Sequence, residues 1–280
     1  MKGFTRHIPN TLTCISLAFG FYASILGLSG NYFGAMTAIF IAAVFDFLDG
    51  FAARMLKAYS PMGKELDSLA DMVSFGVAPG MMLFSFIDEL LYSLSWNESW
   101  ACKLLLLSAF AIAILSALRL AKFNIDTRQT KSFLGLPVPA HAIFWSALIV
   151  AISSATAISV ETALSLGVSS SSEAAAFTAS SELSCHNFSG LISLSHLIAT
   201  IPAQALIIAL SVLAVATSLL LVSEIPMFSL KMSSLRWKDA KLQYILILSA
   251  LILMTLFGSM GISATILLYV ILSLFSRKKA

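Results

Sequence analysis

Four aspartates lie close together in a chain that has few acidic residues. Only 14 of the 280 residues are Asp or Glu, yet one stretch holds Asp46, Asp49, Asp67 and Asp71. The spacings i, i+3 and i, i+4 place each pair on one face of a helix. Carboxylates at close range repel one another and need cations to neutralise them. Oxygen ligands without His or Cys favour Mg²⁺, Mn²⁺ or Ca²⁺, and two such ions would balance four carboxylates.

A pair of divalent ions held by carboxylates suits phosphate chemistry, because the ions can clamp phosphate groups during an in-line displacement. Gly50, Ala53 and Gly63 stand near the aspartates in the sequence, and small side chains would let a bulky substrate approach the helix backbone. Two alternatives remain open at this point. The aspartates could cap helices and pair with the basic residues between them, and the small residues could serve close helix packing.

The composition indicates what kind of protein must position these aspartates. Hydrophobic residues make up 59% of the chain and charged residues 11%, and the mean hydropathy is +0.92. Soluble domains are about 45–50% apolar and about 25% charged. The composition therefore excludes a cytosolic enzyme, a disordered chain and a nucleic-acid binder, and it predicts a protein that crosses the membrane several times.

Eight apolar stretches are candidates for membrane-spanning helices, which need about 20 residues. We place them at 11–29, 32–55, 66–87, 102–122, 138–160, 200–222, 242–258 and 260–275. The last two are short and lie next to each other, so they form either a tight helical hairpin or one kinked element, and seven spans is the alternative count. The predicted fold class is an all-α polytopic transmembrane helix bundle.

The span map predicts where the aspartates meet. Asp46 and Asp49 fall near the end of the second span, and Asp67 and Asp71 fall at the start of the third. Since the loop between these spans is short, the two helices are expected to be antiparallel neighbours. The four carboxylates can then converge at one membrane surface.

Basic residues are divided unevenly between the two sides of the membrane. With eight spans, 16 of the 17 Lys and Arg residues fall on the side of the aspartates and only Lys103 falls on the other. The positive-inside rule predicts that the 16 face the cytoplasm. The aspartates and both termini would then be cytoplasmic.

Two other features suggest no chemistry. The segment 161–199, on the opposite side, is rich in Ser and Ala, and we interpret it as an external insertion that contains a short interfacial helix or is mobile. Cys14, Cys102 and Cys185 are far apart and lack CxxC spacing, so neither a disulfide framework nor a zinc site is expected.

The residues from 46 to 71 read DFLDGFAARMLKAYSPMGKELDSLAD. This segment resembles the signature of the CDP-alcohol phosphatidyltransferases, D-x2-D-G-x2-A-R-x8-G-x3-D-x3-D, at all eight fixed positions. DSLADMVSFGVAPG at 67–80, RLAKFN at 119–124 and GLPVPA at 135–140 are similar to the phosphatidylserine synthase branch, as is IPNTLT at 8–13. The resemblance covers roughly the first 150 residues.

This resemblance implies a reaction. Members of the family transfer a phosphatidyl group from a CDP-linked lipid to an alcohol and release CMP, and this branch uses CDP-diacylglycerol and L-serine. It also implies a six-helix core, here with extra C-terminal helices, and a homodimer in contact with membrane lipids. The whole chain, 1–280, would form a single integral-membrane domain.

The resemblance also implies roles for individual residues. Two ions, Mg²⁺ or Mn²⁺, would be bound by Asp46, Asp49, Asp67 and Asp71. Asp71 is in addition the candidate catalytic base for the acceptor hydroxyl. The CDP group would be bound by Asp49, Gly50, Ala53, Arg54 and Gly63.

Recognition of serine needs a fixed cation for its carboxylate, and arginine suits a planar carboxylate best. Arg119, with Asn124 nearby and Lys131 as a weaker candidate, is predicted to supply this site. The alternative is that Arg119 is a snorkelling or ion-paired structural residue, or only a topology signal. His141 follows the GLPVPA segment and could approach the site, or it could be structural.

Two other functions remain open. The same signature serves acceptors such as glycerol-3-phosphate or inositol phosphate, whose phosphate would need additional basic residues. A cation or solute transporter would also use intramembrane acids, but the clustering at one surface and the lack of an inverted repeat argue against transport. We therefore predict an enzyme that makes phosphatidylserine by direct displacement at the cytoplasmic membrane surface, which is the inner membrane if the source is bacterial.

Overall fold

The computed structural model describes residues 7–94, 100–125, 133–165, 201–227 and 241–276. The N-terminal half contains α1 (Ile8–Leu28), α2 (Tyr32–Met55), α3 (Pro61–Asp71), the π-helical segment η1 (Met72–Val77), α4 (Ala78–Ser93) and α5 (Trp100–Ile125). It is followed by α6 (Val138–Ser165), α9 (Ala203–Val222), α10 (Lys241–Phe257) and α11 (Ser259–Ser276). Two strands of two residues, β1 (Phe133–Leu134) and β2 (Pro226–Met227), pair antiparallel. The predicted all-α fold is confirmed.

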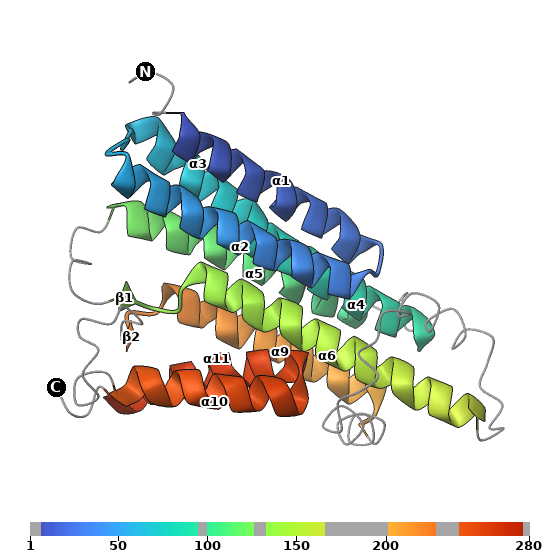
Figure 1. The fold of residues 1–280 in the computed structure, drawn as a ribbon. Coiled ribbons are helices and arrows are strands. Elements are labelled where there is room, and N and C mark those ends of the chain that lie inside the picture. Colours follow the sequence, from blue (N-terminus) through green and yellow to red (C-terminus); the bar gives the residue numbers. More distant parts are fainter. Residues whose placement is uncertain (1–6, 95–99, 126–132, 166–200, 228–240, 277–280) are drawn as a thin grey trace.

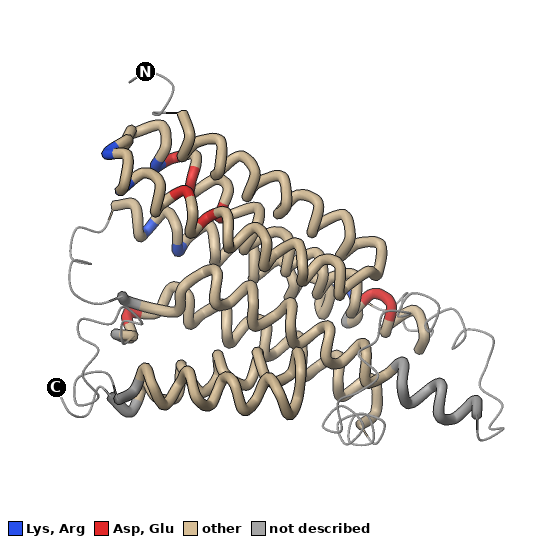
Figure 2. Tube along the Cα trace, viewed as in Figure 1, with Lys and Arg blue, Asp and Glu red and all other residues tan. Residues whose placement is uncertain are grey.

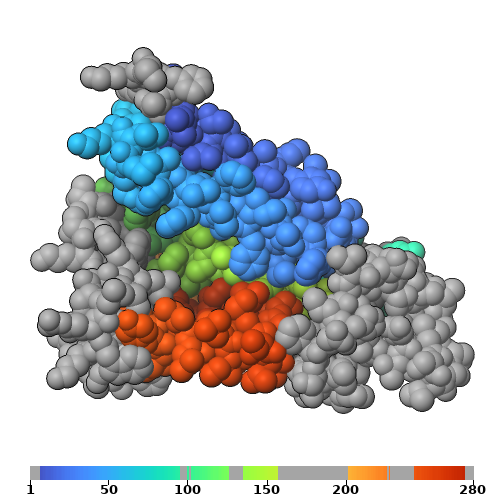
Figure 3. All heavy atoms as spheres, viewed as in Figure 1, coloured from blue at the N-terminus to red at the C-terminus, as the bar shows by residue number. Residues whose placement is uncertain are grey.

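The helices lie side by side in a bundle, with α1 and α2 on one flank and α10 on the other (Figure 1). The space-filling view shows α6 between these two flanks (Figure 3). α1 packs against α2, α3 and α4, α5 packs against α9, and α6 packs against α2 and α11. The C-terminal helices therefore lie against the same bundle as the N-terminal ones.

Within the described part of the chain, six helices are long and apolar enough to cross a membrane. Their outward side chains are also apolar, as at Phe21 (62% exposed), Leu104 (67%) and Val212 (64%). Exposure of so much apolar surface to water is unfavourable, whereas contact of the same surface with lipid chains is favourable. The chain is an integral membrane protein.

The last two apolar stretches are separate helices. α10 and α11 meet at Gly258, which has a positive φ of 56°, and they pack against each other. This is the hairpin alternative, and one kinked element is excluded. Both helices are shorter than the six candidate spans, so a total of eight membrane crossings stays a prediction.

The third span is longer than its sequence suggested. The expected range was 66–87, but α3, η1 and α4 form one continuous helical span over Pro61–Ser93. Ser60 caps its N-terminus by accepting a hydrogen bond from the Gly63 N–H at 3.0 Å, and Pro61 occupies the first turn. The apolar pattern starts late because the first turns of α3 carry the polar site.

The π-helical segment directly follows Asp71 and packs tightly against α1. Ser74 donates a hydrogen bond to the Ser16 carbonyl at 3.1 Å. Gly20 faces Ser74 so closely that an added Cβ would overlap it. A π-bulge of this kind is frequent beside functional sites, and here it fixes the position of α3 against α1.

Charged residues of α2 and α3 gather at the end of the bundle where α1 begins (Figure 2). We call this the basic end, because successive helices run antiparallel and place Arg54, Lys57, Lys64 and Lys122 there, whereas Lys103 lies in the first turn of α5 at the opposite end. For the described residues, the predicted division of basic charge is confirmed. The remaining part of the segment 161–199, from residue 166 onward, lies outside the described residues.

Candidate functional site

The four aspartates form two layers between α2 and α3. Asp49 lies six residues before Met55 at the end of α2, and Asp67 lies six residues after Pro61 at the start of α3. At 1.5 Å per residue both are about 9 Å from the helix ends. We call them the outer pair. Asp46 and Asp71 lie about one turn deeper and form the inner pair.

The antiparallel arrangement brings these carboxyl groups together. Carboxylate oxygens of Asp46, Asp49 and Asp67 all lie within 4.8 Å of one another. The Asp46 side chain also contacts Asp71. Asp49 is only 5% exposed, and the other three are partly buried. The predicted convergence of four carboxylates is therefore present in the structure.

No basic side chain neutralises this cluster within the described residues. The salt bridge among the described residues joins Lys122 to Glu224 at 3.1 Å, away from the cluster. None of the four aspartates forms a salt bridge with a described residue. Asp67 does not cap α3, because Ser60 does. The structural alternative, in which the aspartates serve as caps and ion-pair partners, is therefore wrong.

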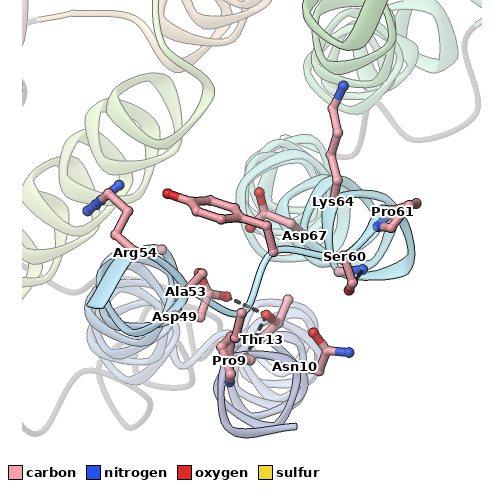
Figure 4. A pocket seen from close by; sticks show the side chains of 14 residues that line it. Pro9, Asn10, Thr13, Asp49, Ala53, Arg54, Ser60, Pro61, Lys64 and Asp67 are labelled. Atoms are coloured by element: carbon pink, nitrogen blue, oxygen red, sulfur yellow. Dashed lines mark hydrogen bonds between the residues drawn. The ribbon is translucent and has the colours of Figure 1, made fainter. Parts of the chain in front are cut away.

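A cavity of about 530 Å³ opens beside the outer pair. Its walls come from the first turns of α1, the last turns of α2, the loop 56–60 and the first turns of α3. The lining residues are Pro9, Asn10, Thr13, Asp49, Gly50, Ala53, Arg54, Ala58, Tyr59, Ser60, Pro61, Gly63, Lys64 and Asp67. Figure 4 shows Asp49 of α2 and Asp67 of α3 on facing walls. All five residues predicted to bind CDP line this cavity.

The two glycines of the signature have different surroundings. A Cβ added at Gly50 would meet nothing closer than the Arg54 Nη1 at 3.7 Å, so this face of α2 is open to the cavity. A Cβ at Gly63 would lie 3.0 Å from the side-chain oxygens of Asn10 and Ser60. Gly50 therefore leaves room for a ligand, whereas Gly63 lets α3 approach α1.

Thr13 is a site residue that the sequence analysis missed. Its Oγ1 lies 2.5 Å from the Asp49 Oδ2 and 3.0 Å from the Pro9 carbonyl. The hydroxyl has one proton, and the carboxylate is the charged and closer acceptor, so we assign donation to Asp49 (Figure 4). The signal was available in the IPNTLT segment, where a threonine stands one turn after proline in an otherwise apolar helix.

The residues predicted to bind serine lie on α5 and after it. Asn124 contacts α3: its side-chain amide donates to the Ser68 Oγ at 2.9 Å, and its carbonyl accepts from the Lys64 Nζ at 3.2 Å. Lys64 accordingly extends toward α5 and away from Asp67 (Figure 4). Arg119 is buried and lies over the Phe123 ring at 5.8 Å. Neither Arg119 nor Asn124 lines the cavity, and Lys131 lies outside the described residues.

His141 lies apart from the aspartates. It is fully buried between α6 and α9, where its Nε2 is 3.0 Å from the Thr217 Oγ1 and 3.1 Å from the Trp145 Nε1. It does not line the cavity. Among the described residues, the structural alternative for His141 is therefore the one supported.

The cluster suits a divalent metal. Three carboxylates present oxygen atoms within 4.8 Å, His and Cys are absent from the described lining, and the negative charge has no basic partner there. Hard oxygen donors in this number match Mg²⁺, Mn²⁺ or Ca²⁺. Thr13 would orient one ligand, as outer hydrogen bonds do in metal sites.

Known proteins are similar in sequence to part of this chain. A CDP-diacylglycerol–serine O-phosphatidyltransferase of Bacillus subtilis is 40% identical over 134 residues, which are 48% of this chain and 70% of that protein. The protein of the same name from Methanocaldococcus jannaschii is 38% identical over 119 residues, 42% of this chain and 52% of its own. An archaetidylserine synthase of Methanothermobacter thermautotrophicus is 31% identical over 138 residues, 49% of this chain and 54% of its own.

The family model for CDP-alcohol phosphatidyltransferases matches residues 6–169. This range includes α1 to α6 and all eight signature residues, and it ends before α9. With more than half of its length matched, and with the carboxylate cluster that the signature describes, this chain belongs to the CDP-alcohol phosphatidyltransferase family.

Proposed function

We propose that this chain transfers the phosphatidyl group of CDP-diacylglycerol to L-serine and forms phosphatidylserine and CMP. The observation that carries the proposal is the cluster of Asp46, Asp49, Asp67 and Asp71, which has no basic partner among the described residues and adjoins a cavity at the basic end. The names of the relatives from Bacillus and Methanocaldococcus support serine as the acceptor.

Two Mg²⁺ or Mn²⁺ ions held by the four carboxylates would neutralise the diphosphate of the donor. The serine hydroxyl attacks the phosphorus that carries the diacylglycerol, a new P–O bond forms, and the bond to the CMP oxygen breaks. Asp71 is the candidate acceptor of the hydroxyl proton. Reactions of this type depend mainly on positioning and charge stabilisation, which Arg54 and the ions held by the carboxylates would supply.

The two parts of CDP-diacylglycerol, its CDP group and its acyl chains, would lie in different surroundings. Gly50 and Ala53 would leave room for the CDP group, and Gly63, which also lines the cavity, would let α3 approach α1. The acyl chains would stay in the lipid around the helices. We place this site at the cytoplasmic surface because, where the structure describes them, nearly all the basic residues lie at the basic end. In a bacterium this would be the inner membrane. A homodimer remains a proposal from the family resemblance, and the mass of the purified protein–detergent complex tests it.

For serine binding we propose Arg119 and Asn124, with Lys131 as a weaker candidate. The contact of Asn124 with Ser68, the neighbour of Asp67, supports a location beside the metals. Arg119→Lys keeps the charge but loses the two-pronged geometry of the guanidinium. The KM for serine should rise while that for CDP-diacylglycerol stays within about twofold. An unchanged KM for serine would remove Arg119 from the site.

The acceptor is tested with purified protein in detergent micelles that contain CDP-diacylglycerol and Mn²⁺. Serine, glycerol-3-phosphate and inositol phosphate are offered separately, and the lipid product is identified by mass spectrometry. We expect phosphatidylserine with serine and no lipid product with the two phosphorylated acceptors. Turnover with one of those acceptors and not with serine would overturn the assignment of serine but not the family chemistry.

A further inference from the structure

The loop between α2 and α3, residues 56–60, is short and anchored at both ends. At its start the Lys57 N–H donates to the Arg54 carbonyl at 3.3 Å, and the Ala58 N–H donates to the Ala53 carbonyl at 3.0 Å. This is the Schellman arrangement that ends a helix. At its end Ser60 caps α3. Tyr59, between these two anchors, is therefore held by fixed backbone on either side.

Tyr59 leaves most of its side chain exposed, although it stands beside the proposed site. It lines the cavity and is 69% exposed. It is the one aromatic residue among the described lining residues. An aromatic side chain left open on a cavity wall offers a flat apolar face to a ligand.

The depth of the aspartates indicates which part of the donor would reach Tyr59. A diphosphate must lie at the level of the outer pair, Asp49 and Asp67, about 9 Å below the helix ends. The acyl chains must leave toward lipid. The nucleoside therefore extends along the last turn of α2, past Gly50 and Ala53, toward the loop 56–60.

We propose that Tyr59 forms one wall of the nucleoside pocket and stacks on the cytosine base. The inference rests on the proposed use of a CDP-linked donor and adds a residue outside the eight fixed positions of the signature. Stacking reads the flat face of the base, so the ring matters and the hydroxyl does not. A tyrosine that only anchored the protein in the membrane interface would leave nucleotide affinity unchanged.

The test measures binding of CMP to the purified protein by calorimetry in the presence of Mn²⁺. Tyr59→Leu should weaken CMP binding about tenfold, within a range of about 5- to 100-fold expected for loss of one base–aromatic stack. Tyr59→Phe should stay within about twofold of the unchanged protein. Tyr92→Leu is the matched control, because Tyr92 is 68% exposed at the opposite end of the bundle, and it should bind CMP normally.

Equal CMP affinity in Tyr59→Leu and the unchanged protein would overturn the inference, and so would a loss of affinity in Tyr59→Phe equal to that in Tyr59→Leu. Elution in size exclusion and melting temperature show whether each variant is folded. The proposed acceptor is tested separately by product formation with serine. If that reaction fails while Tyr59→Leu still weakens CMP binding as predicted, serine is refuted as the acceptor and the nucleoside pocket stands.

Discussion

The Thr13 hydroxyl lies 2.5 Å from the carboxylate of Asp49, and this hydrogen bond joins α1 to the helix that carries the first half of the signature. Thr13 is 4% exposed and Asp49 is 5% exposed. A buried carboxylate held from the side in this way presents its other oxygen in a fixed direction. Thr13 is therefore a positioning residue for a proposed metal ligand.

Replacing Thr13 by Val removes the hydroxyl at nearly constant shape. Loss of such an outer hydrogen bond typically costs 10- to 100-fold in metal affinity or activity. We expect the Mn²⁺ concentration that gives half-maximal activity to rise by about that factor, while Thr13→Ser stays near the original value. Thr37→Val is the control, because the hydrogen bond of the exposed Thr37 hydroxyl goes to the Phe33 carbonyl of its own helix. An unchanged Mn²⁺ dependence in Thr13→Val would contradict the role.

Gly50 and Gly63 allow a paired comparison. Gly50→Ala places a methyl group in open space and favours the helix by about 1 kcal/mol, so the melting temperature should not fall. The methyl group would occupy the proposed CDP site, and the KM for CDP-diacylglycerol should rise about tenfold. Gly63→Ala instead presses on Asn10 and Ser60, and its melting temperature should fall. A stable Gly50→Ala protein with normal kinetics would show that the open face is not used.

Lys57 is the one described residue other than glycine with a positive φ, at 50°. A side chain in this conformation costs roughly 1–2 kcal/mol, partly offset because glycine is more flexible when unfolded. Lys57→Gly should therefore stabilise the protein by about 0.5–1 kcal/mol. A thermal-shift measurement should show a higher melting temperature with unchanged activity. A lower melting temperature would mean that the lysine side chain has a stabilising contact.

The sequence predicted the site better than it predicted the helix ends. The carboxylates converge as expected, because their spacing places each pair on one helix face and the short loop makes the two helices antiparallel neighbours. These are Asp46, Asp49, Asp67 and Asp71. The start of α3 at Pro61 was missed because its first turns are polar, and hydropathy finds only the apolar part of a helix. The π-helical turn after Asp71 depends on the contact of Gly20 with Ser74, which are far apart in the sequence.

For a related reason, the sequence carries only a weak signal for Thr13, in the IPNTLT segment, and none for Tyr59. Each is an ordinary residue in its own segment, and its role depends on which helix or cavity lies opposite. The contact of Asn124 with α3 likewise needs the packing of α5 against the third span. The spacing of residues within one helix can be read directly from the sequence. Contacts between helices depend on how the helices pack, which the spacing does not specify.

The proposed orientation predicts opposite labelling of two sites. In a variant whose three native cysteines are replaced, a single cysteine at Lys57 should be reached by an impermeant thiol reagent only after the membrane is opened. A single cysteine at Glu173, which lies outside the described residues, should be labelled in intact cells. Labelling of both positions from the same side would refute the topology derived from the basic residues.

The most direct test of the account is the metal dependence of CMP release from CDP-diacylglycerol and serine by the purified protein. The account predicts no release after exhaustive chelation, recovery when Mg²⁺ or Mn²⁺ is returned, and a loss of several orders of magnitude in folded Asp67→Asn protein even with metal present. Full turnover in chelated protein, or a normal rate in Asp67→Asn, would contradict the central claim that the four aspartates act by holding divalent ions.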